Sequence, residues 1–167
     1  GLGAAWLHAL KKYGSDAPNL VQGRFAAVLI QPRQGLVRAV TDRFATFSIC
    51  YSSGRNSIRI GERADDVAAS HAEISNQSLF HFLFYHVIPA SRTVFSGVSR
   101  IPAGHALEWR QGSVTCNPYW SPEFGQGSTA PLEVQEARFL DLVESAVARD
   151  AEKGNEELTY ETHLDCC

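Results

Sequence analysis

Four strand-like segments follow one another near the start of the chain with no helix-like segment between them. They are residues 23–32, 35–43, 47–52 and 57–62. Parallel neighbours need a crossover of about a dozen residues or more, so strands this close in sequence pair in antiparallel fashion. The first segment reads as a buried strand that Pro32 ends. The pattern as a whole predicts an antiparallel sheet in an α+β domain.

Turn residues separate the predicted strands. Residues 33–35 lie between the first two strands and residues 53–56 between the next two. Further along, residues 105–110 and 113–119 read as two strands joined by a tight Gln-Gly turn at 111–112. Gly, Asn and Ser favour such turns because they tolerate the required backbone angles. We therefore expect a second hairpin late in the domain.

Three segments have the spacing of helices. Residues 4–14 form a short amphipathic helix with Gly14 at its left-handed end, and residues 76–86 have helical length. The strongest helix spans residues 131–153, with Thr129 as its expected N-cap. Its expected core face consists of Val134, Ala137, Leu140, Val143 and Val147.

A polar, glycine-rich stretch divides the chain. We expect one domain over residues 1–122, a linker over 123–130, and over 131–167 a helix and strand that lead into a further domain. The chain has no Met and opens on Gly1. This opening indicates a fragment or a trimmed chain.

The charge is small and scattered. Lys and Arg number 15 against 18 Asp and Glu, which gives a net charge of -3 and disfavours nucleic-acid or anionic-membrane partners. The longest apolar runs, residues 25–30 and 79–88, are too short or too interrupted to span a bilayer. We expect a soluble, cytoplasmic protein.

The chain has four cysteines, which are Cys50, Cys116, Cys166 and Cys167. Their spacing does not match that of a metal site, so we expect reduced thiols and no bound metal.

Four blocks of sequence carry a family resemblance. They are YGSDAPNLVQGRFAAVLIQP (13–32), DRFATFSICY (42–51), GERADDVAA (61–69) and VIPASRTVFSGVSRIPAGHALEW (87–109), with Tyr119 and Trp120 after them. Their order resembles the glutamine-hydrolysing asparagine synthetases, which are class II glutamine amidotransferases. The resemblance implies an N-terminal-nucleophile hydrolase fold, a four-layer αββα sandwich of antiparallel sheets, incomplete at its amino end.

The resemblance also implies a glutaminase chemistry whose parts precede the first block. In the family an amino-terminal Cys attacks glutamine with its own α-amine as base, and an Asn-Gly pair supplies oxyanion donors. Neither is present, so we expect no catalytic residue in this chain. The Asp that binds the glutamine α-amine corresponds to Leu2, so we expect no glutamine-binding residue either. Ala45 and Ser48 replace a Gly and a Pro of the family pattern.

The end of the chain resembles the start of the family's synthetase domain. There an S-G-G-L-D-S-S loop cradles the pyrophosphate of ATP with glycine amides. Here Leu164 and Asp165 match that loop as a remnant, while Thr162 and His163 replace its glycines. We expect no cofactor in this chain. For the complete family enzyme the resemblance implies ATP, Mg²⁺, glutamine and a synthetase domain of the same polypeptide, with a homodimer as an open option.

Several residues have a structural as well as a functional interpretation. His86 and His105 are candidate bases, but a structural role is favoured without a nucleophile at matching spacing. Arg92 and Thr93 are expected to fix a loop. Cys50 is expected to be a buried small hydrophobe. A plain tail is favoured over a metal or redox site at Cys166 and Cys167, and a core position over a stacking platform for Phe80, Phe82, Phe84 and Tyr85.

Three functions remain open from the sequence. The first is a partial glutaminase-type domain of an ATP-dependent amide-forming enzyme, inactive as this chain alone. The second is a non-catalytic scaffold or substrate-presenting domain, as in the lasso-peptide cyclases and β-lactam synthetases that resemble this family. The third is an unrelated α+β binding domain.

Overall fold

The computed structural model describes residues 2–125, 127 and 129–153. The described residues form two compact units, one ending at Ser121 and one beginning at Pro122. The first unit holds both sheets, and the second holds helix α4 (Leu132–Lys153). None of the helices in these residues is both long and apolar enough to cross a membrane.

Sheet A has four antiparallel strands in the order β1-β2-β6-β7. Its first hairpin pairs Ala26 with Thr41, and its second pairs Arg110 with Ser113 across the Gln-Gly turn. Both expected hairpins are therefore confirmed. The strands are β1 (Ala26–Gln31), β2 (Leu36–Thr41), β6 (His105–Arg110) and β7 (Ser113–Pro118).

Sheet B has three antiparallel strands in the order β4-β3-β5. They are β3 (Cys50–Ser53), β4 (Ile58–Gly61) and the short β5 (Ser99–Arg100). The four consecutive strands expected from the sequence therefore divide into two pairs, one in each sheet. The segment between Thr41 and Cys50 carries the chain from sheet A to sheet B.

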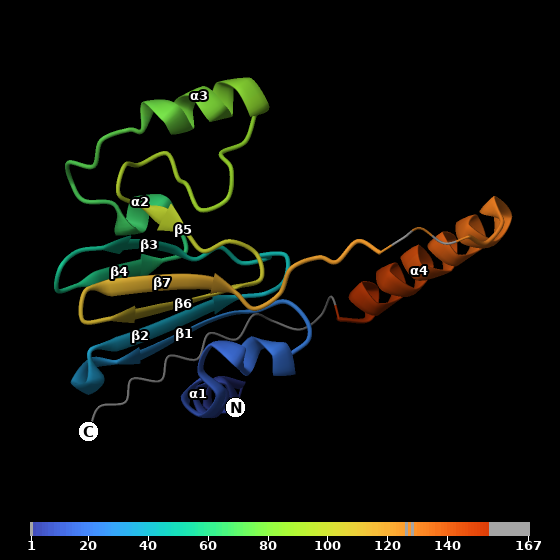
Figure 1. Ribbon diagram of the computed structural model, residues 1–167, viewed down its shortest axis with the longest axis horizontal. Helices are drawn as coiled ribbons and strands as arrows, with labels where there is room; N and C mark the ends of the chain where they lie inside the picture. The colour runs from blue at the N-terminus through green and yellow to red at the C-terminus, as the bar shows by residue number, and fades with distance from the viewer. Residues whose placement is uncertain (1, 126, 128, 154–167) are drawn as a thin grey trace. The chain divides into compact units, whose positions relative to one another are not determined.

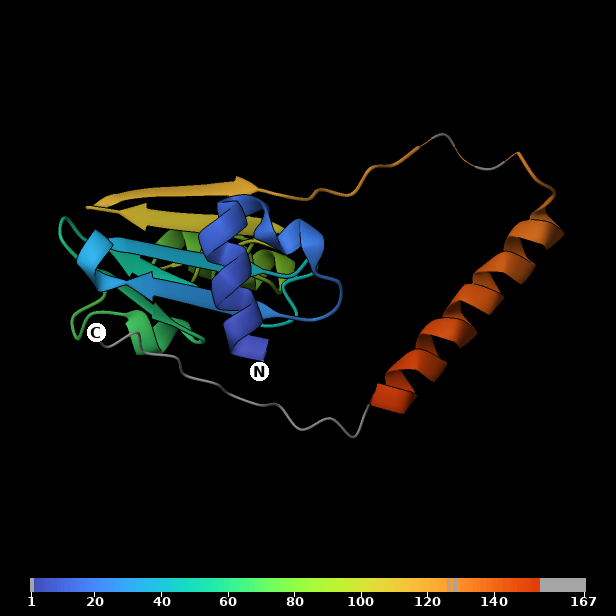
Figure 2. The ribbon, with the colours of Figure 1, turned by 90° about the horizontal axis from the view of Figure 1, so that it is seen from below.

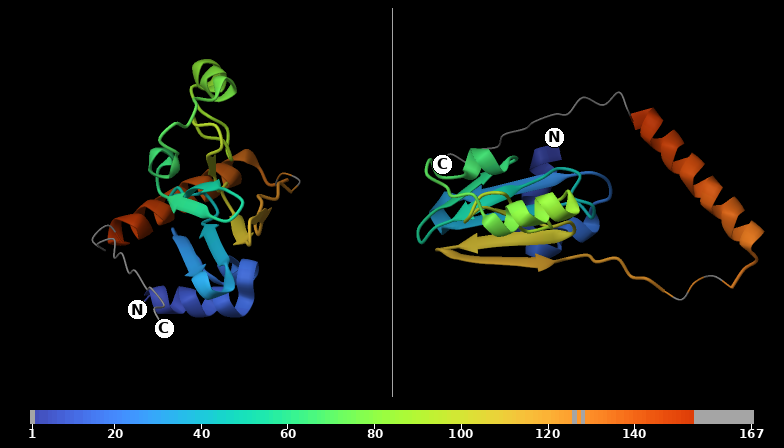
Figure 3. Two further views of the ribbon diagram at one scale, coloured as in Figure 1. Left: turned by 90° about the vertical axis from the view of Figure 1, so that its left-hand side faces the viewer. Right: turned by 90° about the horizontal axis from the view of Figure 1, so that it is seen from above.

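Four layers make up the first unit (Figures 1 and 3). A central core lies between the sheets and includes Val37, Ile101 and Leu107. Helix α1 (Leu2–Tyr13) and the 3-10 helix η1 (Gly14–Leu20) cover the outer face of sheet A, which Figure 2 shows from the helix side. The short helix α2 (Ala64–Val67) packs on sheet B. The expected α+β fold with two antiparallel sheets between helices is confirmed.

Strand β1 was expected to be buried, and this is wrong for half of its residues. Val28 and Ile30 are exposed, although they pair with Ala39 and Val37 of the central core. The reason is position, because β1 is the outermost strand of sheet A and the three strands of sheet B leave this part of its inner face uncovered.

Helix α3 (Asn76–Tyr85) confirms the expected helix, and its end at His86 adopts a left-handed conformation. The expected core position of its aromatic side chains is wrong. Phe84 is 66% exposed, and Phe80, Phe82 and Tyr85 are also exposed. Helix α3 stands away from both sheets (Figure 1), so its rings contact one another, with Phe80 and Phe84 stacked at 5.8 Å.

Helix α4 confirms the expected long helix, with two differences. It begins at Leu132, so Thr129 lies outside the N-cap position, and Gln135 Nε2 donates to the carbonyl of Ala130 at 2.7 Å. The apolar residues of the expected core face are exposed: Val134, Leu140, Val143 and Val147. The second unit contains no other described helix or strand on which this face can pack.

The geometry of the β6–β7 turn predicts that Gly112 does not tolerate substitution. Its φ is 91°, and an added Cβ would overlap the backbone carbonyl of Arg55 in the β3–β4 turn. We expect Gly112→Ala to lower the free energy of unfolding by about 3 kcal/mol or more. The matched control is Gly97→Ala, with φ 76° and open space around the Cβ position, which we expect to cost about 1 kcal/mol. Urea denaturation measures both, and equal costs contradict the prediction.

Candidate functional site

The carboxylate of Asp42 is the most heavily bonded buried side chain in the part of the chain that the structure describes. Asp42 follows β2 and is 2% exposed. Its Oδ1 accepts from the backbone N–H of Phe44 at 2.8 Å, and its Oδ2 accepts from that of Phe25 at 3.1 Å. The backbone N–H and hydroxyl of Thr46 also donate to it at 3.2 and 3.3 Å. A buried charge is tolerated because donors surround it.

Backbone and hydroxyl bonds join further segments at the same place. Gly104 N–H donates to the Asp42 carbonyl at 2.9 Å. The Tyr119 hydroxyl donates to the Thr41 carbonyl at 2.6 Å, and the Thr41 hydroxyl donates to the Pro102 carbonyl at 2.8 Å. We call this region the Asp42 junction, defined by Asp42, Thr46, Phe25, Gly104 and Tyr119. It joins the ends of sheet A to the segment that leads into sheet B.

Two aromatic side chains, Phe44 and Trp120, lie beside the junction. Phe44 is 80% exposed, and its ring centroid lies 5.8 Å from that of Trp120. The Arg43 guanidinium carbon lies 5.8 Å from the Trp120 ring, within cation–π range. Gly104 has φ 66°, and a Cβ there would lie 2.6 Å from the Trp120 carbonyl oxygen. Only glycine therefore allows Trp120 to approach the junction so closely.

The polar groups of the junction hold neighbouring segments in place. Burial raises the pKa of the Tyr119 hydroxyl, and the neighbouring Asp42 carboxylate raises it further against the opposing effect of Arg43. The hydroxyl therefore stays protonated at neutral pH and remains a donor to Thr41. The Asp42 carboxylate already accepts from three residues, which occupy the acceptor sites that a substrate or metal would need.

The two cysteines in the described residues are not activated. Cys50 is buried, as expected, with its Sγ 3.8 Å from the Glu62 carbonyl oxygen. Burial raises its pKa despite the opposing effect of Arg100, and burial also raises the pKa of Cys116. Thiolate is the nucleophilic form, so these upward shifts favour the less reactive thiol form at neutral pH. No group of three His, Cys, Asp or Glu residues suited to a metal occurs among the residues that the structure describes.

The structure places the other candidates apart from one another. His86 ends α3, while His105 begins β6 with its Nδ1 2.8 Å from the Ala103 carbonyl oxygen. The Thr93 hydroxyl is buried and donates to the Val98 carbonyl at 2.9 Å, as expected for a loop-fixing residue. Leu2 begins α1. The remaining candidates lie outside the described residues: Leu164, Asp165, Cys166 and Cys167.

Sequence reasoning missed the roles of Asp42 and Tyr119. Asp42 appeared only as a letter within a quoted block, and Tyr119 only as a residue that follows the blocks. A weak signal was available for Asp42, because an acidic residue directly after an apolar strand and before a turn is often bonded to turn amides. No local signal marked Tyr119, whose partner Thr41 is 78 residues away in the chain.

Most of the chain matches a known protein family. The sequence model of a family described as a glutamine amidotransferase domain matches residues 5–120. The matched region begins in α1 and ends at Trp120, so it includes both sheets and the whole Asp42 junction. No curated protein matches the chain.

Removal of the Asp42 carboxylate tests the junction. In Asp42→Ala, the N–H groups of Phe25, Phe44 and Thr46 lose their acceptor. We therefore expect the free energy of unfolding to fall by about 3–5 kcal/mol. The control is Asp16→Ala, because Asp16 is exposed in η1, and it should change stability by no more than about 0.5 kcal/mol. A cost at Asp42 as small as that at Asp16 rules out the junction as a stabilising element.

The backbone conformation of Ala45 predicts that replacing it with Gly stabilises the fold. Its φ is 49°, in the left-handed region, and the resembling family has Gly at this position. Ala45→Gly removes the Cβ strain at the cost of some chain entropy, so we expect a net gain of about 0.5–1 kcal/mol in the free energy of unfolding. Ala68→Gly is the control, since Ala68 is extended with φ -62° and should lose stability instead. Thermal and urea unfolding of both variants decide the sign.

Proposed function

The chain belongs to the glutamine amidotransferase domain family, and we propose that it is a partial glutaminase-type domain of an asparagine-synthetase-like, ATP-dependent amide-forming enzyme. In this proposal the chain by itself releases no ammonia from glutamine. The family match over residues 5–120 and the ordered blocks quoted from the sequence support the proposal. The cytoplasm is the proposed location.

The state of the thiols carries the proposal of inactivity. Glutamine hydrolysis by this class of domain begins with thiolate attack on the side-chain amide, assisted by a base and by oxyanion donors. Burial raises the pKa values of Cys50 and Cys116, and at Cys50 it outweighs the opposing effect of Arg100. These residues therefore supply a scaffold rather than a nucleophile.

The exposure of helix α3 supports the proposal that a partner domain covers it. Its apolar side chains face all directions around the helix axis, and such helices are normally buried. A synthetase domain of the same polypeptide is the proposed partner, and ATP and Mg²⁺ are proposed to bind there. A homodimer is the alternative arrangement, and α3 is the first place to look for its contact.

A second candidate function is a non-catalytic scaffold in a relative of the lasso-peptide cyclases and β-lactam synthetases. Two substitutions favour it. Leu2 stands where the family binds the glutamine α-amine, and an aliphatic side chain makes no ion pair there. Ala45 has a left-handed backbone conformation, which is strained for Ala but not for the Gly that the family has at this position.

Ammonia release tests the proposal. The purified chain is incubated with glutamine and separately with an electrophilic glutamine analogue, and ammonia and covalent adducts are measured. We expect no ammonia above buffer and no analogue adduct at Cys50 or Cys116, because both thiols are protonated. Glutamine-dependent release that disappears in Cys50→Ser or Cys116→Ser, or an analogue adduct on either thiol, overturns the proposal.

The same assay separates the two candidates when it is applied to the encoded protein with all its flanking sequence. Ammonia release that is coupled to ATP consumption supports the amide-forming enzyme with a working glutaminase. ATP consumption without glutaminase activity supports the scaffold.

A further inference from the structure

Strand β1 has a free edge on the side away from β2. Within the described residues it pairs with β2 alone, and Figure 2 shows it at the border of sheet A. The Asp42 N–H donates to the Phe25 carbonyl at 2.9 Å, and this bond sets the phase of the ladder. Since hydrogen-bonded and non-hydrogen-bonded pairs alternate, the N–H and C=O groups of Ala26, Val28 and Ile30 point away from β2. These groups form a pairing edge.

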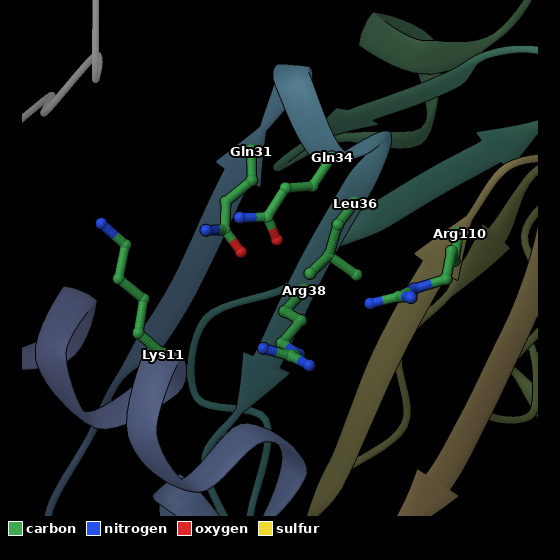
Figure 4. Close-up of a pocket in the computed structure, with 6 residues that line it drawn as sticks. All are labelled: Lys11, Gln31, Gln34, Leu36, Arg38 and Arg110. Carbon is green, nitrogen blue, oxygen red and sulfur yellow. The ribbon is translucent and has the colours of Figure 1, made fainter. Parts of the chain in front are cut away.

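The side chains of the same three residues are open on the inner face of sheet A. Val28 is 42% exposed and Ile30 is 53% exposed. The opposite face of the strand is covered, because Leu29 packs in the cluster beneath α1. Figure 4 shows the Gln31 side chain on that same side of the sheet, where α1 lies. An added strand therefore has both backbone groups and apolar side chains to pair with.

Strand β1 lacks the features that protect the other edge strands from pairing with another chain. Such features are charged side chains, proline and short length. Strand β7 ends in Pro118, β4 carries the exposed Arg59, and β5 has only 2 residues. Residues 26–31 contain no charged residue and no proline. Of the edges in the described sheets, that of β1 is thus the most open to pairing.

Arginine residues flank this edge on both sides. Arg24 precedes β1, Arg33 follows it in η2 (Pro32–Gln34), and both side chains are exposed. Neither forms an ion pair with another residue that the structure describes. Residues 17–37 contain no Asp or Glu. The charge at the ends of the edge is positive, so acidic residues complement it.

The same charges disfavour a second copy of the chain as the occupant. Two copies of β1 pair all their free groups only when Val28 lies opposite Val28, because Ala26 then lies opposite Ile30. In that register Arg24 of each copy lies opposite Pro32 of the other, next to its Arg33. Like charges meet at both ends of such a ladder, which costs free energy of association.

We propose that the free edge of β1 binds an extended segment of a partner polypeptide as an additional antiparallel strand, with acidic residues at both ends of that segment. The segment bonds to the N–H and C=O groups of Ala26, Val28 and Ile30, and its carboxylates lie near Arg24 and Arg33. Backbone bonds supply affinity, and the acidic ends and alternate apolar side chains supply specificity. This interaction is independent of the proposed glutaminase-type function.

A designed peptide tests the proposal with the purified chain. The peptide alternates Thr and Val in its centre and has Glu at both ends, so that Val lies opposite Ala26, Val28 and Ile30. Calorimetry and amide NMR shifts provide the readouts. We expect saturable binding, with the largest shifts at those three residues. A peptide with Lys in place of Glu should bind about tenfold more weakly.

N-methylation of the peptide separates strand pairing from simple apolar contact. Methylated amides at the Val positions cannot donate to β1, so this peptide should not bind. Amides at the Thr positions point away from β1, and the matched peptide methylated there should bind to within about twofold of the parent.

Variants of the chain locate the site. Ile30→Lys places a charge on the edge and should abolish peptide binding, whereas Thr115→Lys adds the same charge to β7 at the opposite edge of sheet A and should not. Arg24→Glu combined with Arg33→Glu should reverse the preference, so that the Lys-ended peptide binds more tightly. Arg59→Glu in sheet B is the control for this reversal and should leave the preference unchanged.

Several results overturn the proposal. Two of them are an absence of saturable binding and equal affinity for the Glu-ended and Lys-ended peptides. A concentration-dependent dimer that Ile30→Lys dissociates overturns it in favour of a second copy at the edge. Slow hydrogen exchange at the amides of Val28 and Ile30 in the chain alone overturns it in favour of another part of the same chain. Circular dichroism confirms that each variant is folded before its titration is interpreted.

Discussion

The buried carboxylate of Asp42 is the interaction on which the arrangement of the two sheets depends. A charge with 2% exposure is stable only when donors replace water, and here the donors come from both sides of Asp42 in the chain. Phe25 precedes β1, while Phe44 and Thr46 follow β2. Because these bonds fix the segment after Asp42, Ile49 enters the central core and β3 begins sheet B in a defined place.

The same packing that stabilises the sandwich also desolvates its thiols. Cys50 contributes to the core of sheet B with Val67 and Val98, and desolvation there raises its pKa. Arg100 lowers this pKa in part, but burial outweighs its effect, and a nucleophilic thiol also needs access to solvent. The described residues thus separate two tasks. They provide rigid strand ends and loops, and under the proposed function the nucleophile for glutamine comes from other groups.

Local chemistry was readable from the sequence, while burial and long-range pairing were not. The Gln-Gly turn at 111–112 specified its hairpin through backbone preference alone, so both of its strands were predicted. The exposure of Phe84 depends on where α3 sits, and amphipathic spacing carries no information on that. The bond between Arg38 and Glu108 joins residues 70 apart in the chain, and no local pattern marks such a pair.

The two ends of β2 differ in how much of their polar capacity is already used. At the Asp42 end, each carboxylate oxygen accepts from protein donors, so the groups there are committed to structure. At the Leu36 end, the Glu108 carboxylate lies 2.8 Å from the Arg38 guanidinium and 3.9 Å from that of Arg110, and these side chains are partly exposed. Buried polar groups that are fully paired rigidify a fold, whereas ion pairs that water can reach contribute little to stability. The two ends of β2 therefore contribute unequally to the stability of the fold.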